Sequence, residues 1–312
     1  MTCDPWSAVK TGHWLLVTGY LLAAAPVVGQ APLSGAWDGV RLRHDAQRYD
    51  IALAIPDTGS RISATVTTHW KLTGRGPLVL DLDSEMTVRA ASVNGTAVSW
   101  RRAGDLVELP VPGAAGSEAT TTISYDGVSL EGNGLLIRGS GITRTAFGDN
   151  WPNRAHLWIA SHDHPSDKAA VGWRIEAPAE YRVVANGRLE RVDTLAAGRL
   201  RWQFDNPEPI PVYTFVIGMA RFAVTGLAPA CAVRCVPVSI WSYPDDSAFA
   251  VNGPFRRASE IVAFFSQRIA PFPFGELRHV ESSTAYGGME NSTAIFYDEK
   301  AWREGRTQEP FW

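Results

Sequence analysis

The 312-residue sequence has little cysteine, no run of basic residues and, beyond its first thirty residues, no long apolar run. A formal net charge of −3 without a basic cluster gives no reason to expect nucleic acid or an anionic membrane as a partner. The lack of a later apolar run argues against an integral membrane segment in the mature chain. What remains is ordinary globular composition, with 45 % hydrophobic and 20 % charged residues and enough length for one large domain or two ordinary ones.

The N-terminal residues resemble an export signal. Lys10 precedes an apolar stretch from Trp14 to Ala25, which is too short to span a bilayer core of roughly 30 Å but suits the apolar region of a signal peptide. Val27 and Gly29 are small residues at the −3 and −1 positions of a cleavage site. We therefore expect residues 1–29 to be a signal peptide and the mature protein to be periplasmic or extracellular. A buried N-terminal helix is the alternative.

The three cysteines fit this compartment. Cys3 would leave with the signal peptide, and Cys231 and Cys235 lie in the stretch PACAVRCVP. A short loop between extended segments can bring two cysteines within disulfide reach in an oxidising compartment. A metal site would need two further ligands, and no His or other Cys lies close in sequence. We expect a disulfide, with two free thiols as the alternative.

The segment from residue 35 to about 243 shows a β pattern. Short runs such as ISATVTTHW and PLVLDLD are rich in Val, Ile, Thr or Leu, several alternate apolar and polar residues, and Gly, Pro, Asn or Asp bounds them. Asn94-Gly95 predicts a two-residue hairpin turn, and Asn186-Gly187 repeats this signal between YRVVA and RLERV. Helical periodicity is nearly absent. The pattern predicts a mainly β domain of packed or curved antiparallel sheets.

The character of the sequence changes after residue 243. Apolar residues recur at helical spacing from Pro254 to Ile269, and Pro254 suits a first helical turn. The segment PFPFG ends the helix. Two short extended runs, LRHVES and AIFYDE, follow with Gly287 to Asn291 between them. We expect residues 244–312 to be the opening of a second, mixed α/β domain.

Gly287, Gly288, Met289, Glu290 and Asn291 resemble the Gly-x-Met-Glu-Asn motif of the M1 zinc aminopeptidases. Three upstream patches occur in family order: residues 163–169 resemble the signature D-x-P-x-x-K-A, VVANGRL resembles V-x-S-N-G-x-L, and PIPVYTFVIGMARF resembles the strand that ends the family's N-terminal domain. The segment PFPFGELRHVESSTAY also leads into the motif as in the family. The resemblance covers roughly residues 40–312.

This resemblance implies a saddle-shaped antiparallel β-sandwich domain followed by the beginning of a thermolysin-like α/β catalytic domain. It also implies that Glu290 binds the free α-amine of a peptide substrate, while the backbone of Gly287, Gly288 and Met289 lies along the peptide like an added strand. A carboxylate is the natural partner of an ammonium group, glycine lets a backbone approach closely, and main-chain pairing is tolerant of side chains. The expected partners are therefore peptide N-termini. A plain turn with a surface glutamate is the alternative.

The sequence lacks the part of such an enzyme that performs hydrolysis. The family's zinc is held by His-Glu-x-x-His and a distant Glu, and none of the seven His residues here is followed by Glu. Zinc is thus expected in the complete family enzyme, but its ligands are not in these 312 residues, and we assign no metal ligand and no catalytic residue. We expect a chain truncated before this motif and inactive alone. The rival interpretations are a non-catalytic peptide-binding module derived from the same fold and an unrelated β-sandwich that binds carbohydrate.

Several polar and aromatic residues permit more than one interpretation. Many family members have Gln or Glu twelve residues before the Asp of the D-x-P signature, where this chain has Trp151; the neighbouring Asp149 and Asn150 could contact the substrate instead or cap a turn. His156, His162 and His164 lack the spacing of a structural zinc site, so we predict a structural role for them. We also expect the tryptophans to pack in sheets rather than to form a carbohydrate platform: Trp151, Trp158, Trp173 and Trp202.

Overall fold

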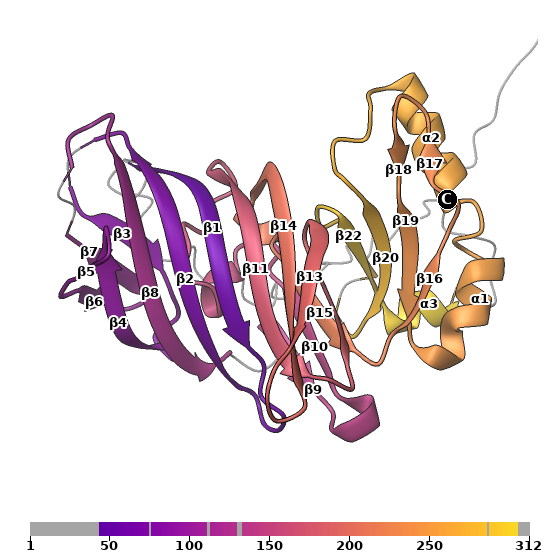
Figure 1. Cartoon of the computed structure of the whole chain (residues 1–312), viewed down its shortest axis with the longest axis horizontal. Coiled ribbons are helices and arrows are strands. Elements are labelled where there is room, and N and C mark those ends of the chain that lie inside the picture. Colours follow the sequence, from indigo (N-terminus) through magenta and orange to yellow (C-terminus); the bar gives the residue numbers. More distant parts are fainter. Residues whose placement is uncertain (1–43, 75, 111–112, 130–132, 286, 305–312) are drawn as a thin grey trace, which may run out of the picture.

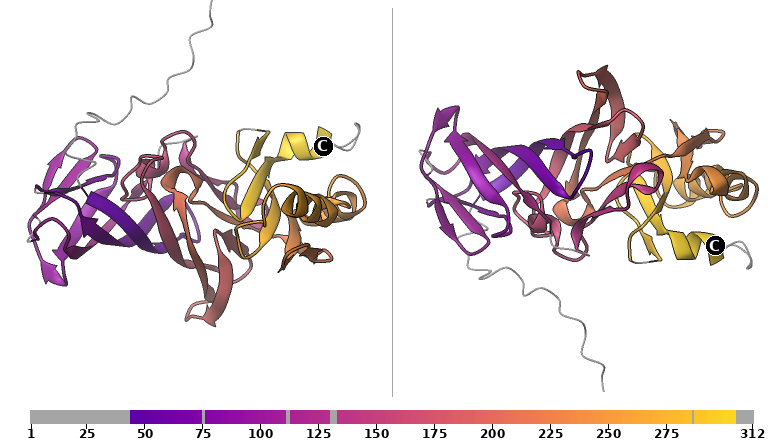
Figure 2. Two further views of the ribbon diagram at one scale, coloured as in Figure 1. Left: turned by 90° about the horizontal axis from the view of Figure 1, so that it is seen from above. Right: turned by 90° about the horizontal axis from the view of Figure 1, so that it is seen from below.

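The computed structural model describes residues 44–74, 76–110, 113–129, 133–285 and 287–304. The predicted signal peptide, residues 1–29, lies outside the described residues. Strands account for 51 % of the structure and helices for 13 %, which confirms the prediction of a mainly β chain. The molecule is elongated: β4 to β7 lie at one end, β1 lies near the middle between β2 and β11, and the C-terminal strands lie at the other end (Figures 1 and 2).

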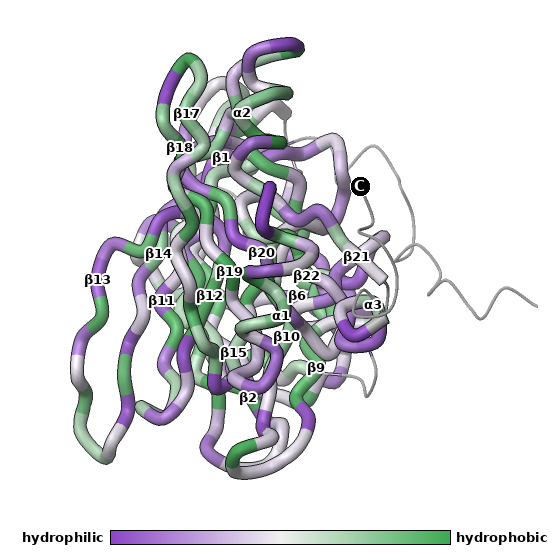
Figure 3. The backbone as a smooth tube through the Cα atoms, turned by 90° about the vertical axis from the view of Figure 1, so that its right-hand side faces the viewer, coloured by the Kyte–Doolittle hydropathy of each residue, from purple (hydrophilic) through white to green (hydrophobic). Residues whose placement is uncertain are grey.

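The largest sheet has eight strands in the order β13-β14-β11-β1-β2-β8-β4-β5. Its strands are β1 (His44–Ala54), β2 (Arg61–Leu72), β4 (Thr87–Val93), β5 (Thr96–Ala97), β8 (Glu118–Val128), β11 (Lys168–Pro178), β13 (Arg188–Thr194) and β14 (Arg199–Pro211). All neighbours are antiparallel except β1 and β11, which are parallel. In β2, Ile62, Ala64 and Val66 are buried on one face, while Thr65 and Thr67 bond to hydroxyls of β8 on the other. This alternation, visible as colour changes along the strands in Figure 3, places the core on one face of the sheet.

Two smaller sheets complete the β domain. One has the order β3-β7-β6, from β3 (Leu78–Asp81), β6 (Arg101–Ala103) and β7 (Leu106–Leu109); the other has the order β12-β15-β10-β9, from β9 (Gly134–Arg138), β10 (Thr145–Asp149), β12 (Arg182–Ala185) and β15 (Ile217–Ala220). Short 3₁₀ helices connect strands at η2 (Gly141–Thr143), η3 (Ala155–Leu157), η4 (Val212–Thr214) and η5 (Pro244–Asp246).

Trp158 stacks on Trp173 with ring centroids 6.0 Å apart in the core. Trp202 is partly buried against this core and Trp151 is 44 % exposed, so sheet packing is confirmed for Trp158 and Trp173 and does not describe Trp151.

The two predicted hairpins have different outcomes. Asn94 (φ 49°) and Gly95 (φ 78°) form the turn between β4 and β5, where Val93 pairs with Thr96, as predicted. The hairpin predicted at Asn186-Gly187 is wrong, because β12 and β13 belong to different sheets. Gly187 has φ 83°, and a Cβ there would lie 2.1 Å from the carbonyl oxygen of Asp205. Glycine is needed here for close backbone approach rather than for a hairpin turn.

A five-stranded mixed sheet follows the β domain, in the order β16-β19-β20-β22-β21. Its strands are β16 (Ala223–Gly226), β19 (Val238–Ser242), β20 (Leu277–Ser282), β21 (Gly288–Met289) and β22 (Ala294–Asp298). The first two precede residue 243, so this sheet begins before the predicted start of the second domain. The domain ranges 35–243 and 244–312 themselves stay predictions.

A disulfide and three helices accompany this sheet. Cys231 and Cys235 are joined as predicted, in a small hairpin of β17 (Ala230–Cys231) and β18 (Cys235–Val236). The helices are α1 (Ser247–Asn252), α2 (Ala258–Arg268) and α3 (Glu299–Glu304). The helix predicted within residues 254–269 is confirmed as α2, but Pro254 lies in the turn between α1 and α2, not in a first helical turn. Among the residues described, every helix is too short or too polar to cross a lipid bilayer.

An apolar cluster joins the five-stranded sheet to the β domain. Phe147 of β10 meets Phe296 of β22 edge to face, with ring centroids 5.7 Å apart, and Phe222 lies 6.1 Å from Phe147 in the same way. Val184 and Val280 are fully buried in the same cluster. The second sheet is therefore packed on the first part of the chain through a hydrophobic core, which fixes the position of β21 and β22.

Candidate functional site

The Gly-Gly-Met-Glu-Asn motif forms the edge of the five-stranded sheet. Gly288 and Met289 make up β21, which pairs antiparallel with β22 at Tyr297 and Phe296. The N–H of Asp298 donates to the carbonyl oxygen of Gly287 at 3.3 Å. No other described strand pairs with β21, whose position beyond β22 is visible in Figure 3. An edge strand of this kind presents unpaired backbone groups to which another chain can add.

The two glycines of the motif are not required by packing within the described chain. A Cβ on Gly287 would meet nothing closer than 3.8 Å, at Ala301, and a Cβ on Gly288 would meet nothing closer than 3.8 Å, at Tyr297. Both residues are exposed, and neither has a positive φ. Gly287 and Gly288 therefore add no side chain to the exposed surface around β21.

The remaining residues of the motif divide into an exposed and an anchored group. Glu290 is exposed and Met289 is half-buried, whereas Asn291 is 4 % exposed. The Asn291 amide donates to the carbonyl oxygen of Met289 at 3.5 Å, and its own carbonyl accepts the N–H of Ala294. Asn291 thus shapes the turn into β22. That the Glu290 carboxylate lies in a substrate groove stays a prediction.

Asn186 anchors the turn between β21 and β22 to the β domain. Its side-chain amide donates to the carbonyl oxygens of Thr214 and Ser292, each at 2.8 Å, and its carbonyl oxygen accepts the N–H of Val216 at 2.7 Å. The N–H of Gly187 donates to the hydroxyl of Thr293 at 2.8 Å. Asn186 is fully buried, so these bonds replace those it would make with water.

Arg278 of β20 connects the same two parts of the molecule from within the core. It is 2 % exposed and donates to the carbonyl oxygens of Ala185 at 3.1 Å and Gly187 at 2.8 Å. Its guanidinium forms an ion pair with Glu276 at 2.6 Å and lies over the ring of Phe204. Burial lowers the pKa of Arg278, and the carboxylate of Glu276 acts in the opposite direction. The sequence pattern pointed to Asn186 only as part of a hairpin turn and of the family-like segment VVANGRL, and it did not point to Arg278, whose signal was a charged residue inside the extended run LRHVES.

A second set of contacts holds the segment between β20 and β21. Arg138 of β9 donates to the carbonyl oxygen of Ser283 at 2.8 Å, and the hydroxyls of Thr145 and Ser283 lie 3.3 Å apart. Burial raises the pKa of Asp149, while Arg154, Arg138 and the N–H of Ala285 oppose this rise. Both ends of the motif are therefore attached to the β domain.

Of the two polar residues before Trp151, Asn150 is held by internal hydrogen bonds, and Asp149 pairs with Arg154 through one carboxylate oxygen. Asn150 is 2 % exposed, and its side chain accepts the indole N–H of Trp158 at 2.7 Å and donates to the carbonyl oxygen of Phe215. Its backbone carbonyl accepts the N–H of Arg154, which closes a turn, and Arg154 pairs with Asp149 at 2.9 Å. The turn-capping interpretation therefore describes Asn150.

The histidines of the HDH segment make internal contacts. His156 Nδ1 lies 2.7 Å from Asp163, and His162 Nδ1 lies 2.6 Å from Asp167, with all four side chains buried. Burial lowers the pKa of His156, but the hydrogen bond and charge of Asp163 raise it, and the resulting pKa lies above the ordinary value. His164 contacts the hydroxyl of Ser166. These contacts support the predicted structural role.

The zinc implied by the family resemblance has no matching ligand set in the described part of the chain. No group of three or more His, Cys, Asp or Glu there is arranged to hold a metal ion. A structural or catalytic zinc site needs three or four such ligands in tetrahedral geometry. We therefore derive no step through a metal.

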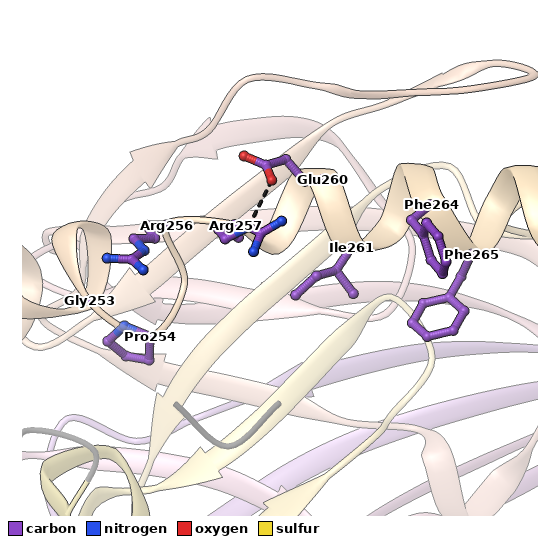
Figure 4. Close-up of a pocket in the computed structure, with 8 residues that line it drawn as sticks. All are labelled: Gly253, Pro254, Arg256, Arg257, Glu260, Ile261, Phe264 and Phe265. Carbon is purple, nitrogen blue, oxygen red and sulfur yellow. Dashed lines mark hydrogen bonds and ion pairs between the residues drawn. The ribbon is translucent and has the colours of Figure 1, made fainter. Parts of the chain in front are cut away.

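Three hollows lie near these elements, and two of them adjoin each other. One, of about 550 Å³, lies between the domains and is lined by Arg138, Ser283, Thr284, Asp298, Glu299, Lys300 and Arg303. It adjoins a larger cavity of about 910 Å³, which shares Arg138, Ser283, Glu299 and Arg303. A separate hollow of about 560 Å³ lies beside α2 and includes the exposed Phe264 and Phe265 (Figure 4). Only the interdomain hollow is next to the motif, because Asp298 is bonded to Gly287.

Comparison with known proteins shows the fold. No family model matches the sequence, and a search of curated proteins finds no match. Among solved structures, a mutant M1 zinc metallopeptidase from Deinococcus radiodurans bound to a Tyr-Ser-Ala substrate has a TM-score of 0.74 and 20 % identity, covering 83 % of this chain and 61 % of that one. An M1 zinc metallopeptidase structure from the same organism has a TM-score of 0.72 and 20 % identity, covering 81 % and 59 %. A two-domain M1 mutant bound to L-arginine has a TM-score of 0.71 and 19 % identity, covering 83 % and 61 %.

Over most of its length the chain thus shares the fold of M1 zinc metallopeptidases, and the resemblance stated from the motifs is confirmed as a likeness of fold. It spans about three-fifths of the length of the structures it matches.

Proposed function

We propose that the chain is the N-terminal part of an exported M1-type zinc aminopeptidase and that it holds the N-terminus of a peptide. The observation that carries this proposal is the unpaired edge strand β21, with two open glycines, followed at once by the exposed carboxylate of Glu290. A peptide added antiparallel to β21 would begin at the Glu290 end, where its ammonium group meets a carboxylate. One structure with the same fold contains a Tyr-Ser-Ala substrate, which supports a peptide as the ligand.

Export is part of the proposal. Residues 1–29 have the composition of a signal peptide. The disulfide between Cys231 and Cys235 supports an oxidising compartment, since such bonds are rare where thiols are kept reduced. We infer that the mature protein is periplasmic or extracellular.

Glu290→Gln is expected to weaken binding of a free-amine pentapeptide to this chain about tenfold. Charge-assisted hydrogen bonds contribute roughly 1.5–3 kcal/mol, and an exposed carboxylate should lie at the low end, near the 1.4 kcal/mol that equals a factor of ten. The measurement is displacement of a fluorescent peptide tracer, followed by anisotropy. Glu260→Gln, at an exposed glutamate on α2, is the matched control and should change nothing. If N-acetylated and free peptides compete equally well with the unaltered chain, Glu290 does not hold the N-terminus.

The 312-residue polypeptide itself is expected to release no amino acid from aminoacyl substrates, with or without added zinc, because it contains no His-Glu-x-x-His. Release of a fluorophore in proportion to protein, blocked by a chelator, would contradict this. The coding sequence beyond codon 312 separates the two main functional hypotheses. A His-Glu-x-x-His within a few tens of codons supports the peptidase, and a genuine stop codon supports a peptide-binding module.

A further inference from the structure

The direction of a peptide bound to β21 follows from the position of Glu290, and this step rests on the proposed function. Glu290 comes after β21, so only an antiparallel peptide whose ammonium group meets Glu290 can pair its following residues along the motif. A parallel peptide would leave the motif after its first residue. In antiparallel register the first peptide residue lies opposite Glu290, and residues two, three and four lie opposite Met289, Gly288 and Gly287. At about 3.4 Å per residue, the fourth residue reaches the Gly287 end roughly 10 Å from the amine.

The interdomain hollow of about 550 Å³ begins at this Gly287 end. Asp298, which lines the hollow, donates its N–H to the carbonyl oxygen of Gly287, and a Cβ on Gly287 would lie 3.8 Å from Ala301 of α3. Arg138, from β9, and Ser283 line the same hollow. A peptide that continues past its fourth residue leaves the Gly287 end of β21, and this hollow lies beside that end.

The acidic groups of the hollow are already engaged. Asp298 accepts the N–H of Ala301 at 2.7 Å, as the first turn of α3 requires. Glu299 accepts the hydroxyl of Tyr243 at 2.9 Å. Each of these two carboxylates therefore has a donor of its own, and Glu299 reaches Arg303 only at 4.0 Å.

The guanidinium groups of Arg138 and Arg303 make few hydrogen bonds with the described residues, relative to the number of their N–H donors. Arg138 is exposed, and the hydrogen bond described for it is the one to Ser283. The Arg303 side chain is 54 % exposed, and among the described residues its ion-pair partners are Asp246 and Glu299, whose carboxylate oxygens lie at 3.9 and 4.0 Å, beyond hydrogen-bond distance. Each guanidinium has five N–H donors in a planar arrangement that matches a carboxylate. The larger cavity that shares both arginines gives room for a side chain to enter.

We propose that the hollow between Arg138 and Arg303 is a subsite for a carboxylate on the downstream part of the bound peptide, at its fourth or fifth residue. The carboxylate is either the side chain of Asp or Glu or the C-terminus of a short peptide. This assigns the protein a preference for peptides that are acidic a few residues after a free N-terminus.

The test is competition binding, in which unlabelled peptides displace the fluorescent peptide tracer from the protein. Leu-Ala-Ala-Glu-Ala amide is compared with Leu-Ala-Ala-Gln-Ala amide for the side chain, and the tetrapeptide Leu-Ala-Ala-Ala is compared as acid and amide for the C-terminus. An exposed ion pair contributes up to about 1 kcal/mol, so the acidic member of at least one pair should bind about three- to fivefold more tightly. The preference should disappear at high salt.

Arg303→Gln and Arg138→Gln should each reduce this preference to about twofold or less, while the neutral peptides bind as before. Arg138 also bonds to a backbone carbonyl, so Arg234→Gln is the matched control: Arg234 is exposed and donates to the carbonyl oxygens of Phe272 and Phe274. It should leave the preference unchanged.

The outcomes separate the two proposals. Equal binding of acidic and neutral peptides to the unaltered chain overturns the subsite, and so does a preference that survives both Arg138→Gln and Arg303→Gln. Failure of every free-amine peptide to bind, or equal binding after N-acetylation, overturns the proposed function and removes the basis for the subsite as well.

Discussion

Replacing Arg278 by methionine is expected to lower the free energy of unfolding by about 3–5 kcal/mol, the usual cost of removing one partner from a buried ion pair. The substitution leaves the carboxylate of Glu276, 18 % exposed, without its cation. It also removes the donors to the carbonyl oxygens of Ala185 and Gly187. The measurement is equilibrium unfolding in guanidinium chloride, followed by tryptophan fluorescence.

The control for this prediction is Arg257→Met on α2. Arg257 pairs with Glu260 at 2.8 Å, but both side chains are about two-thirds exposed, and such a pair contributes less than about 1 kcal/mol. The double variant Arg278→Met/Glu276→Gln should recover part of the loss, because the unpaired buried charge is gone. A loss for Arg278→Met as small as that for Arg257→Met would mean that Arg278 does not hold the two parts of the molecule together.

Compared with the unaltered chain at the same pH, Glu281→Gln is expected to be more stabilising at pH 8 than at pH 5, by about 2–3 kcal/mol. Glu281 is fully buried in β20, and burial raises its pKa to about 7, against the ordinary 4.5. The folded state therefore keeps a proton that the unfolded state loses between these two values, so stability falls as pH rises through this window. The difference between about 7 and 4.5 corresponds to about 3 kcal/mol.

The groups around Glu281 explain why the rise is not larger. The N–H of Tyr243 donates to the Glu281 carboxyl at 2.8 Å, and Arg303 also lowers its pKa, whereas Glu299 raises it. Urea unfolding at pH 5, 6, 7 and 8 measures the effect, with the exposed Glu260→Gln as control. Parallel stability curves for Glu281→Gln and the unaltered chain would show that Glu281 has the same pKa folded and unfolded.

The contacts around β21 show how the fold holds this short edge strand in place. A two-residue edge strand has few bonds of its own, and its glycines add no packing. Asn186 and Arg278 hold the turn after it and the strand beside it, while Arg138 and Thr145 hold the segment before it. Because these anchors come from the strands before β16 or contact them, the first part of the chain fixes the position of β21.

Local sequence patterns determined much of this protein. Alternating apolar and polar residues specify strands because successive side chains point to opposite faces, as in β2. Asn94-Gly95 specifies its turn because both residues adopt positive φ. The helical spacing after Pro254 located α2, and the five-residue motif with its upstream patches pointed to the M1 fold that the solved structures share.

Only the tertiary structure decided which strands pair across long sequence distances. Asn186-Gly187 has the residue types of a hairpin turn, yet the side-chain amide of Asn186 donates to the carbonyl oxygen of Ser292, more than one hundred residues later. The chain passes at this point from one sheet to another. The parallel pairing of β1 with β11, the burial of Arg278 and Glu281, and the cavity between Arg138 and Arg303 also depend on distant segments. A period of two or 3.6 residues records which face of an element is buried; it carries no information about the partner that buries it. That partner is selected by packing and by the satisfaction of buried polar groups over the whole fold.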